Sequence, residues 1–368
     1  MLKHNISLKL SGAELINAAQ DRLLELLGDI PFVTHVTLEC HPTTQNRADL
    51  TVTLQAAGSH WILVFEVKQL SQPRHVREAV YQLRRRLNSL PDRQTYGLFI
   101  APYLSEESIA LLRGESIGYL DLVGNCFLSF DSIYIERRGA PNSSIRRKTL
   151  RELFAPKASR VLRVLLEDPT RPWRVTELAQ AANVSLGQAS NVRRALLDRE
   201  WALVDSSGVS LKNPNALLDA WRGEYKPPIL RETHYYTLLH GAALESSIRE
   251  AFATPGADQH VLFSSFSAAR WLAPFARVPG QFLYADVKGE ELLKSTLQLD
   301  SVPRGANILL SIPKDDSAFM YRRQVADGLW STGPLQTYLD LSIAGDRGLE
   351  AADHLRRETL DRKWHRLP

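Results

Sequence analysis

Two carboxylates and a lysine are the residues of this sequence best suited to chemistry at a phosphate. Glu66 and Lys68 stand two positions apart at the end of the apolar run 61–65, so a β-strand would turn both side chains to one face. Asp49 starts the preceding predicted strand, and an antiparallel pairing would place it beside Glu66. Carboxylate oxygens bind Mg²⁺, and a lysine could orient or deprotonate the attacking water. The pattern therefore predicts catalysis by Asp49, Glu66 and Lys68, with Asp49 and Glu66 as the metal ligands.

The elements around these residues must hold them in one place. Strands are predicted at residues 35–40, 48–55 and 61–68, and the turn Ala-Ala-Gly-Ser-His joins the last two as a hairpin. A helix precedes these strands, and a second helix follows at residues 74–90. A strand, a short helix and two further strands come next. The order α-β-β-β-α-β-α-β-β predicts a mixed sheet flanked by helices.

This arrangement is similar to that of a known nuclease family. Asp49, sixteen intervening residues and Glu66-Val67-Lys68 at a strand end resemble the PD-(D/E)xK superfamily, the fold of restriction endonucleases and Holliday junction resolvases. The resemblance implies a restriction-endonuclease-like domain at residues 1–140 and Mg²⁺-dependent cleavage of DNA. The sequence departs from the family pattern at Ala48, where a proline is usual.

The same resemblance implies further site residues on the flanking helices. Some members carry a glutamine on the helix after the Glu-x-Lys strand, and Gln82 stands at that place. A glutamate of the first helix matches either Glu14 or Glu25, and the sequence does not choose between them. The basic run at residues 84–86 could contact phosphates, or it could be a solvated helix face.

The Glu-x-Lys motif also has a plainer interpretation. The tripeptide is common, and an exposed cross-strand ion pair contributes less than about 1 kcal/mol to stability. A nuclease-like fold does not ensure cleavage either, because activity depends on the site and not on the fold. The alternatives are an active endonuclease and a nuclease-like domain that only helps to engage DNA or a partner.

Residues 155–225 carry a second pattern, of three short helices and a hairpin. Helices are predicted at residues 159–167, 176–182 and 186–199, with Ser185 as the cap of the third, and two short strands flank Ser-Ser-Gly. This pattern resembles the winged helix-turn-helix DNA-binding domains. The resemblance implies that the third helix enters the major groove of double-stranded DNA. Its outward side chains, which could bond base edges or phosphates, are Gln188, Ser190, Asn191, Arg193 and Arg194.

Positive charge is concentrated in the same part of the chain. The protein has a formal net charge of +4, and residues 146–226 hold fifteen Lys and Arg against nine Asp and Glu. Because phosphate neutralisation dominates sequence-independent DNA binding, this local excess favours contact with DNA. A winged helix can also serve protein–protein contacts, in which case the arginines only solvate the helix.

Residues 229–368 alternate predicted helices and strands, beginning with a helix at 236–252, and indicate a C-terminal α/β domain. The segments SSFSAARWLA, PLQTYLDL and GDRGLEAADHLR resemble the C-terminal part of AbiEi-like antitoxins, of the type IV toxin–antitoxin class. The resemblance implies repression of the protein's own operon beside a nucleotidyltransferase-like toxin. The spacing of Tyr338, Leu339 and Leu341 also suits an ordinary core helix.

The sequence as a whole predicts an α/β multidomain protein of 368 residues. Our leading interpretation is a DNA-binding regulator or antitoxin-like protein with a nuclease-like N-terminal domain. The alternative is an Mg²⁺-dependent endonuclease targeted by its winged helix, and a third interpretation is a protein-interaction scaffold. A homodimer would suit a palindromic site, although no coiled-coil seam is present.

Compartment and redox state follow from simpler patterns. No apolar run approaches about 18 residues, and the first ten residues lack the apolar core of a signal peptide, so we expect a cytoplasmic protein. Cys40 and Cys126 lie in apolar, strand-like stretches. Two such cysteines are expected to be reduced packing residues and not part of a disulfide framework.

Overall fold

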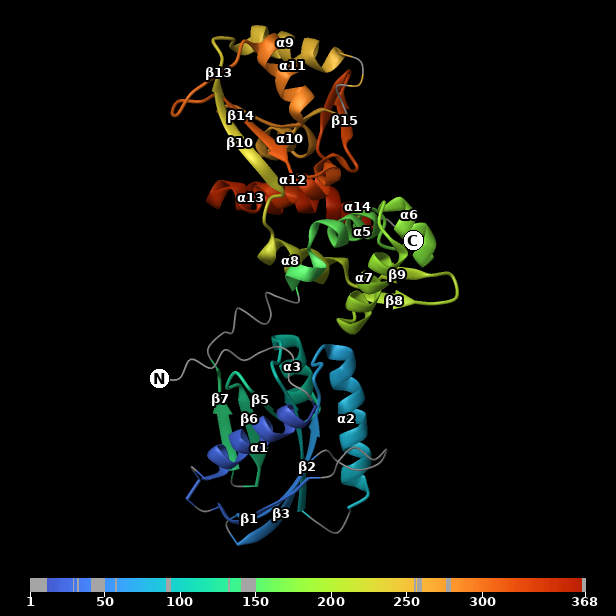
Figure 1. Ribbon diagram of the computed structural model, residues 1–368, viewed down its shortest axis with the longest axis vertical. Helices are drawn as coiled ribbons and strands as arrows, with labels where there is room; N and C mark the ends of the chain where they lie inside the picture. Colours follow the sequence, from blue (N-terminus) through green and yellow to red (C-terminus); the bar gives the residue numbers. More distant parts are fainter. Residues whose placement is uncertain are drawn as a thin grey trace. The chain divides into compact units, whose positions relative to one another are not determined.

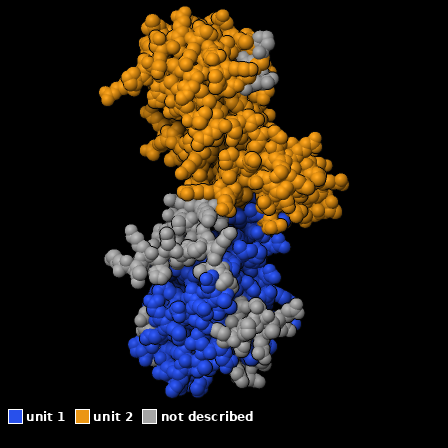
Figure 2. Space-filling model, in the orientation of Figure 1, with its two compact units in different colours: residues 1–149, 195–200 blue, residues 150–194, 201–368 orange. Residues whose placement is uncertain are grey.

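The structure is a computed structural model of an α/β protein with mixed sheets. It describes residues 12–28, 30–31, 33–40, 50–56, 58–90, 94–131, 133–139, 150–254, 256, 260–275 and 279–365. The chain forms two compact units, residues 1–149 with 195–200 and residues 150–194 with 201–368, coloured blue and orange in Figure 2. Within the described residues, no helix combines the length and the apolar character needed to cross a membrane.

The first unit is built on a seven-stranded sheet whose strands follow one another in chain order (Figure 1). Its elements are α1 (Gly12–Gly28), β1 (Val33–Cys40), β2 (Leu50–Ala56), β3 (Ser59–Val67), α2 (Pro73–Asn88), β4 (Gln94–Ala101), α3 (Glu106–Gly114), β5 (Gly118–Asp121), β6 (Cys126–Phe130) and β7 (Ile133–Arg137). The pairs β3–β4 and β4–β5 are parallel and the others antiparallel. The mixed sheet is thus confirmed, with the short strand β7 in addition to those predicted.

Helices cover both faces of this sheet because the side chains of its central strands alternate. Leu63 and Phe65 of β3 point to one face, where they pack with buried leucines of α1. Val64 points to the other face and packs with buried residues of α2 and α3. By the same alternation Glu66 lies on the α2 face, within a layer that is otherwise apolar. The sheet therefore carries this carboxylate into the interior of the domain.

The second unit opens with a group of helices and a hairpin that lie where the sequence predicts them. These elements are α5 (Pro156–Glu167), α6 (Val175–Ala181), α7 (Leu186–Asp198), β8 (Ala202–Val204), β9 (Val209–Leu211) and α8 (Pro214–Glu224). The last turn of α7, from Ala195, is grouped with the first unit. Asn183, in the turn between α6 and α7, has a φ of 51°. The Ser185 hydroxyl accepts a hydrogen bond from the backbone N–H of Gln188 at 3.2 Å and so caps α7. Trp173 forms an antiparallel bridge with Val209, which ties the hairpin to the segment before α6.

The rest of the second unit is a second mixed sheet, in the order β13-β10-β14-β12-β11-β16-β15. Its strands are β10 (Ile229–Tyr236), β11 (Val261–Phe263), β12 (Gln281–Ala285), β13 (Asp300–Ser301), β14 (Ile308–Pro313), β15 (Arg323–Ala326) and β16 (Leu329–Ser331). The helices are α9 (Gly241–Ala253), α10 (Ser265–Leu272), α11 (Val287–Leu297), η2 (Asp316–Phe319), α12 (Pro334–Leu341), α13 (Gly345–Leu355), η3 (Arg356–Asp361) and α14 (Arg362–His365). α9 and α11 pack on one face of this sheet, with Ile248 and Leu293 among the residues that they bury there.

One sequence-based expectation about this region is wrong. The helix predicted at residues 236–252 begins only at Gly241, and Tyr236 ends the strand β10. β10 pairs with both β13 and β14, so the sheet satisfies the backbone groups of this segment. Pairing with distant strands thus outweighs the local helical pattern.

A buried polar network joins α5 to α12. The Asp340 carboxylate accepts hydrogen bonds from the hydroxyls of Tyr225 and Tyr284 at 2.8 and 2.9 Å. Gln336 donates to the same oxygen at 2.7 Å and accepts from the Arg163 guanidinium at 2.5 Å. Burial raises the pKa of Asp340 to about 6, although the three hydrogen bonds act in the opposite direction.

The C-terminal helical segment packs against the same group of helices. The Trp364 indole donates a hydrogen bond to the Leu166 carbonyl at 3.1 Å, and Lys363 forms an ion pair with Glu167 at 2.6 Å. Arg356, at the start of the π-helical turn η3, forms an ion pair with a carboxylate of α8 at 2.5 Å. Contacts from the last described residues therefore complete the packing of α5 and α8.

Asp340→Asn should remove a pH-dependent loss of stability. Because the folded state raises this pKa, folding favours the protonated carboxyl, and the wild type loses stability as the pH rises from about 4 through about 6. The amide cannot ionise, so the unfolding free energy of the variant should rise by about 3 kcal/mol relative to the wild type across this window. Urea unfolding at pH 4, 5, 6 and 7 measures the difference. Asp346→Asn, at an exposed position of α13, is the control, and parallel pH curves for Asp340→Asn and the wild type would contradict the prediction.

Candidate functional site

Glu66 forms a buried ion-pair cluster with Lys68 and Arg86 on the α2 face of the first sheet. The Glu66 side chain is 1% exposed, and its Oε1 lies 2.5 Å from the Lys68 ammonium. Its Oε2 accepts a hydrogen bond from the Arg86 guanidinium. The Lys68 amide donates to the Ile100 carbonyl of β4 at 2.9 Å, so strand pairing fixes the backbone beside the cluster. The structure thus brings Glu66 and Lys68 together and adds Arg86 to them.

The cluster is held together by the cost of burying a charge. An ionised carboxylate taken out of water without a partner costs several kcal/mol, and here both oxygens face a cation. Lys68 is the most accessible member, at 37% exposure against 20% for Arg86. A divalent ion at Glu66 would share each oxygen with a cation already bound there, which Coulomb repulsion disfavours.

Of the other residues predicted for this site, the three that the structure describes do not join the cluster. Asp49 lies outside the described residues. Gln82 is half-buried on α2, and Glu14 is exposed on α1. Glu25 forms an ion pair with Arg22 at 2.5 Å on the surface of α1. Among the residues that the structure describes, no group of three or more His, Cys, Asp or Glu side chains could hold a metal ion.

The arginine run of α2 is divided between internal ion pairs and solvent. Arg84 pairs with Glu115 at 2.5 Å, Arg86 pairs with Glu66, and Arg85 is exposed. Sequence reasoning missed Arg86 as a partner of Glu66. A signal was present, because position 86 follows the last buried leucine of α2 by three residues and so continues its apolar stripe. Because a buried charge needs a partner, a cation on the buried stripe of a helix indicates a carboxylate on the element that packs against it.

The second candidate site is the outer surface of α7. Asn191 and Arg194 are exposed, and Gln188, Ser190 and Arg193 are half-buried. The opposite side of the helix is fixed in the core by Ala189, Val192 and Leu196. The structure therefore leaves Asn191 and Arg194 open to a partner, whereas Gln188, Ser190 and Arg193 are only partly accessible.

Comparison of the chain with models of known protein families finds no match, and comparison with characterised proteins finds none either. Function is therefore inferred here from the residues and their geometry.

Arg86→Ala should destabilise the first unit by about 2–3 kcal/mol. The substitution leaves a buried carboxylate with Lys68 as its remaining cation, and breaking a buried pair costs more than removing an exposed one. Arg85→Ala removes the same charge from an exposed neighbouring position and should cost less than about 0.5 kcal/mol. Thermal and urea unfolding compare the two variants, and equal losses would show that Arg86 does not support Glu66.

Proposed function

We propose that the protein is a DNA-binding regulator of the antitoxin-like type, in which α7 contacts double-stranded DNA. The observation that carries the proposal is the division of α7 between a fixed core side and an open polar side. Ala189, Val192 and Leu196 are buried, whereas Asn191 and Arg194 are exposed. A helix anchored in this way presents its polar side chains as a rigid surface.

The exposed residue types suit base and phosphate contacts. An asparagine can bond an adenine edge through two hydrogen bonds, and an arginine can bond guanine or a phosphate. Gln188 and Ser190 stand beside them with part of their surface open. Arg193 is half-buried at the edge of this surface, and a phosphate would meet the exposed end of its guanidinium. These features support a winged-helix assignment of residues 155–225.

Two further cations of the same module support phosphate contact. Arg171 and Arg174 are exposed in the segment that leads into α6. The Arg171 guanidinium lies 3.8 Å from the centroid of the Trp173 ring, and Trp173 bridges to the hairpin. An arginine held over an indole loses less side-chain freedom when it binds a phosphate.

The regulatory part of the proposal rests on the AbiEi-like resemblance of residues 264–273 and 334–356. In this proposal the C-terminal domain serves interaction, and its partner is a nucleotidyltransferase-like toxin made from the same operon. The DNA target is the control region of that operon, reached in the cytoplasm. A homodimer would match two half-sites of a palindrome.

Replacing Arg193 and Arg194 together by alanine should reduce the salt dependence of DNA binding by about two log-log units. Each lost phosphate contact removes about one released counterion, so affinity falls most at low salt. Fluorescence anisotropy with a labelled duplex, between about 50 and 200 mM salt, measures the slope. Replacing Arg249 and Arg270, which are exposed on α9 and α10, is the charge-matched control. A wild type without salt-sensitive DNA binding would support a protein-interaction scaffold instead.

An Mg²⁺-dependent endonuclease is the second candidate function. The observation in its favour is the 2.5 Å contact between Lys68 and Glu66 at the end of β3, with Lys68 partly exposed. Of the described residues, Glu66 would supply metal ligands and Lys68 would orient or deprotonate the attacking water. The contact of Arg86 with the second oxygen of Glu66 ranks this function below DNA binding, because Arg86 would have to give way.

Supercoiled plasmid incubated with MgCl₂ separates the two functions. Because Glu66 is paired with two cations, we expect no metal-dependent nicking by the wild type. Nicking that is lost in Asp49→Ala, Lys68→Ala and Gln82→Ala would establish the endonuclease. Lys288→Ala, at an exposed position of α11, is the control variant that should behave as the wild type does.

A further inference from the structure

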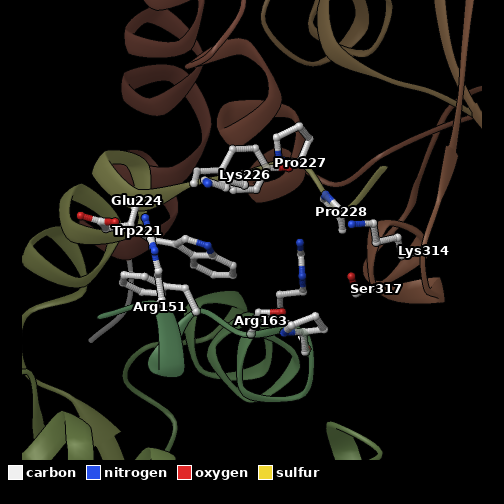
Figure 3. A pocket seen from close by; sticks show the side chains of 13 residues that line it. Arg151, Arg163, Trp221, Glu224, Lys226, Pro227, Pro228, Lys314 and Ser317 are labelled. Atoms are coloured by element: carbon white, nitrogen blue, oxygen red, sulfur yellow. Dashed lines mark hydrogen bonds between the residues drawn. The ribbon is translucent and has the colours of Figure 1, made fainter. Parts of the chain in front are cut away.

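A cavity of about 320 Å³ lies inside the second unit, where α5 and α8 meet the segment 225–228. Figure 3 shows Trp221 on one side of it, Lys314 and Ser317 on the other, and Arg163 between them. Its walls therefore come from α5 and α8, from the connecting segment and from the residues just after β14 together with η2. A volume of this size is at the lower end of pockets that bind small molecules.

The wall of the cavity is strongly cationic. Arg151, Arg163, Lys226 and Lys314 line it, against Glu224 as the one acidic residue of the lining. In the described part of the chain, none of these four cations forms an ion pair with a carboxylate. The rest of the lining is largely aromatic rings and prolines, which do not neutralise charge. The cavity thus holds an excess of positive charge in a partly enclosed, low-dielectric space, where an anion gains most.

Arg163 forms the floor of this cavity and offers a hydrogen-bond donor there. The residue is 3% exposed, and its Nε has no hydrogen-bond partner among the described residues. A terminal nitrogen donates to Gln336 at 2.5 Å, and the guanidinium carbon lies 5.4 Å from the centroid of the Trp221 ring. In Figure 3 the side chain rises from α5 toward the middle of the cavity. A buried donor without an acceptor costs about 1–3 kcal/mol, which a bound acceptor would recover.

We propose that this cavity binds a small phosphorylated anion of mononucleotide size or smaller. The Nε of Arg163 donates to a phosphate oxygen at the floor, and Lys226 and Lys314 hold the anion from the rim. Phosphate fits better than a single carboxylate because its several oxygens and double charge match a convergent set of cations. Duplex DNA does not fit, since a phosphate on a rigid duplex cannot reach a side chain as buried as that of Arg163.

The site differs from the α7 surface and does not depend on DNA binding. Its walls belong to α5 and α8 on one side and to Lys314 and η2 on the other, so a bound anion would bridge these elements. A ligand that binds only the folded protein raises its stability by mass action, and here the gain should appear in the unfolding of the second unit.

Isothermal titration calorimetry of the full chain at constant ionic strength tests the proposal. The probes are pyrophosphate and AMP as phosphorylated anions, citrate as a carboxylate of comparable charge, and a short duplex as a polymeric phosphate. We expect saturable binding of pyrophosphate or AMP with one site per chain, and weaker binding of citrate. In thermal unfolding, the melting temperature should rise with the concentration of the phosphorylated probe. Tighter binding of citrate, or displacement of the bound anion by the duplex, would overturn the assignment.

Variants at the rim and at the floor of the cavity locate the site. Lys314→Ala, at an exposed position, should weaken binding of the phosphorylated probe at least about tenfold. Lys288→Ala removes an exposed lysine elsewhere in the same unit and should leave the affinity unchanged. Arg163→Lys keeps the charge but lacks Nε, and should lose binding while circular dichroism shows a folded chain. Equal affinities of the two lysine variants, or the absence of saturable binding of every probe, would refute the proposal.

Discussion

The pairing of charged groups that folding removes from water is the constraint on which this structure most depends. Glu66 sits in the layer between a sheet and a helix and is held there by Lys68 and Arg86. In the second unit, Asp340 and Arg163 are both buried and are connected through Gln336. Because an unpaired ion in such a place would cost several kcal/mol, each of these groups fixes the elements that carry its partners.

The same constraint gives the basic residues of α2 and those near α6 and α7 different roles. The cations of α2 that lie near Glu66 and Glu115 form ion pairs inside their own domain, whereas Arg194 of α7 and the two arginines before α6 are exposed. The end of β3 at Glu66 and the outer surface of α7 are therefore not equivalent in this chain. The strand end has its carboxylate neutralised by the protein itself, and the helix leaves its polar groups for another molecule. For this reason we rank the proposed DNA binding above the proposed cleavage.

Local periodicity predicted most of the secondary structure and none of the long-range pairing. The alternation of residues 61–68 and the helical spacing of residues 186–199 both describe neighbours in sequence, and both elements lie where we expected them. β10 was missed because its partners β13 and β14 lie far along the chain. Asp340 had no predicted role for the same reason, since Tyr225, Tyr284 and Arg163 meet it only through the tertiary fold. The exposure of Asn191 and Arg194 on α7 could be predicted from helical spacing, whereas the cationic cavity could not.

The contacts of Trp364 and Lys363 with α5 also bear on how the protein can be divided. A fragment cut out at residues 155–225 would lose the indole that covers the Leu166 carbonyl and the glutamine that accepts from Arg163. Its first helix would then expose to solvent a face that evolved as an interior surface. Residues 155–225 are therefore packed as one side of an internal interface, and transferring them to another protein would also require the C-terminal segments that cover α5.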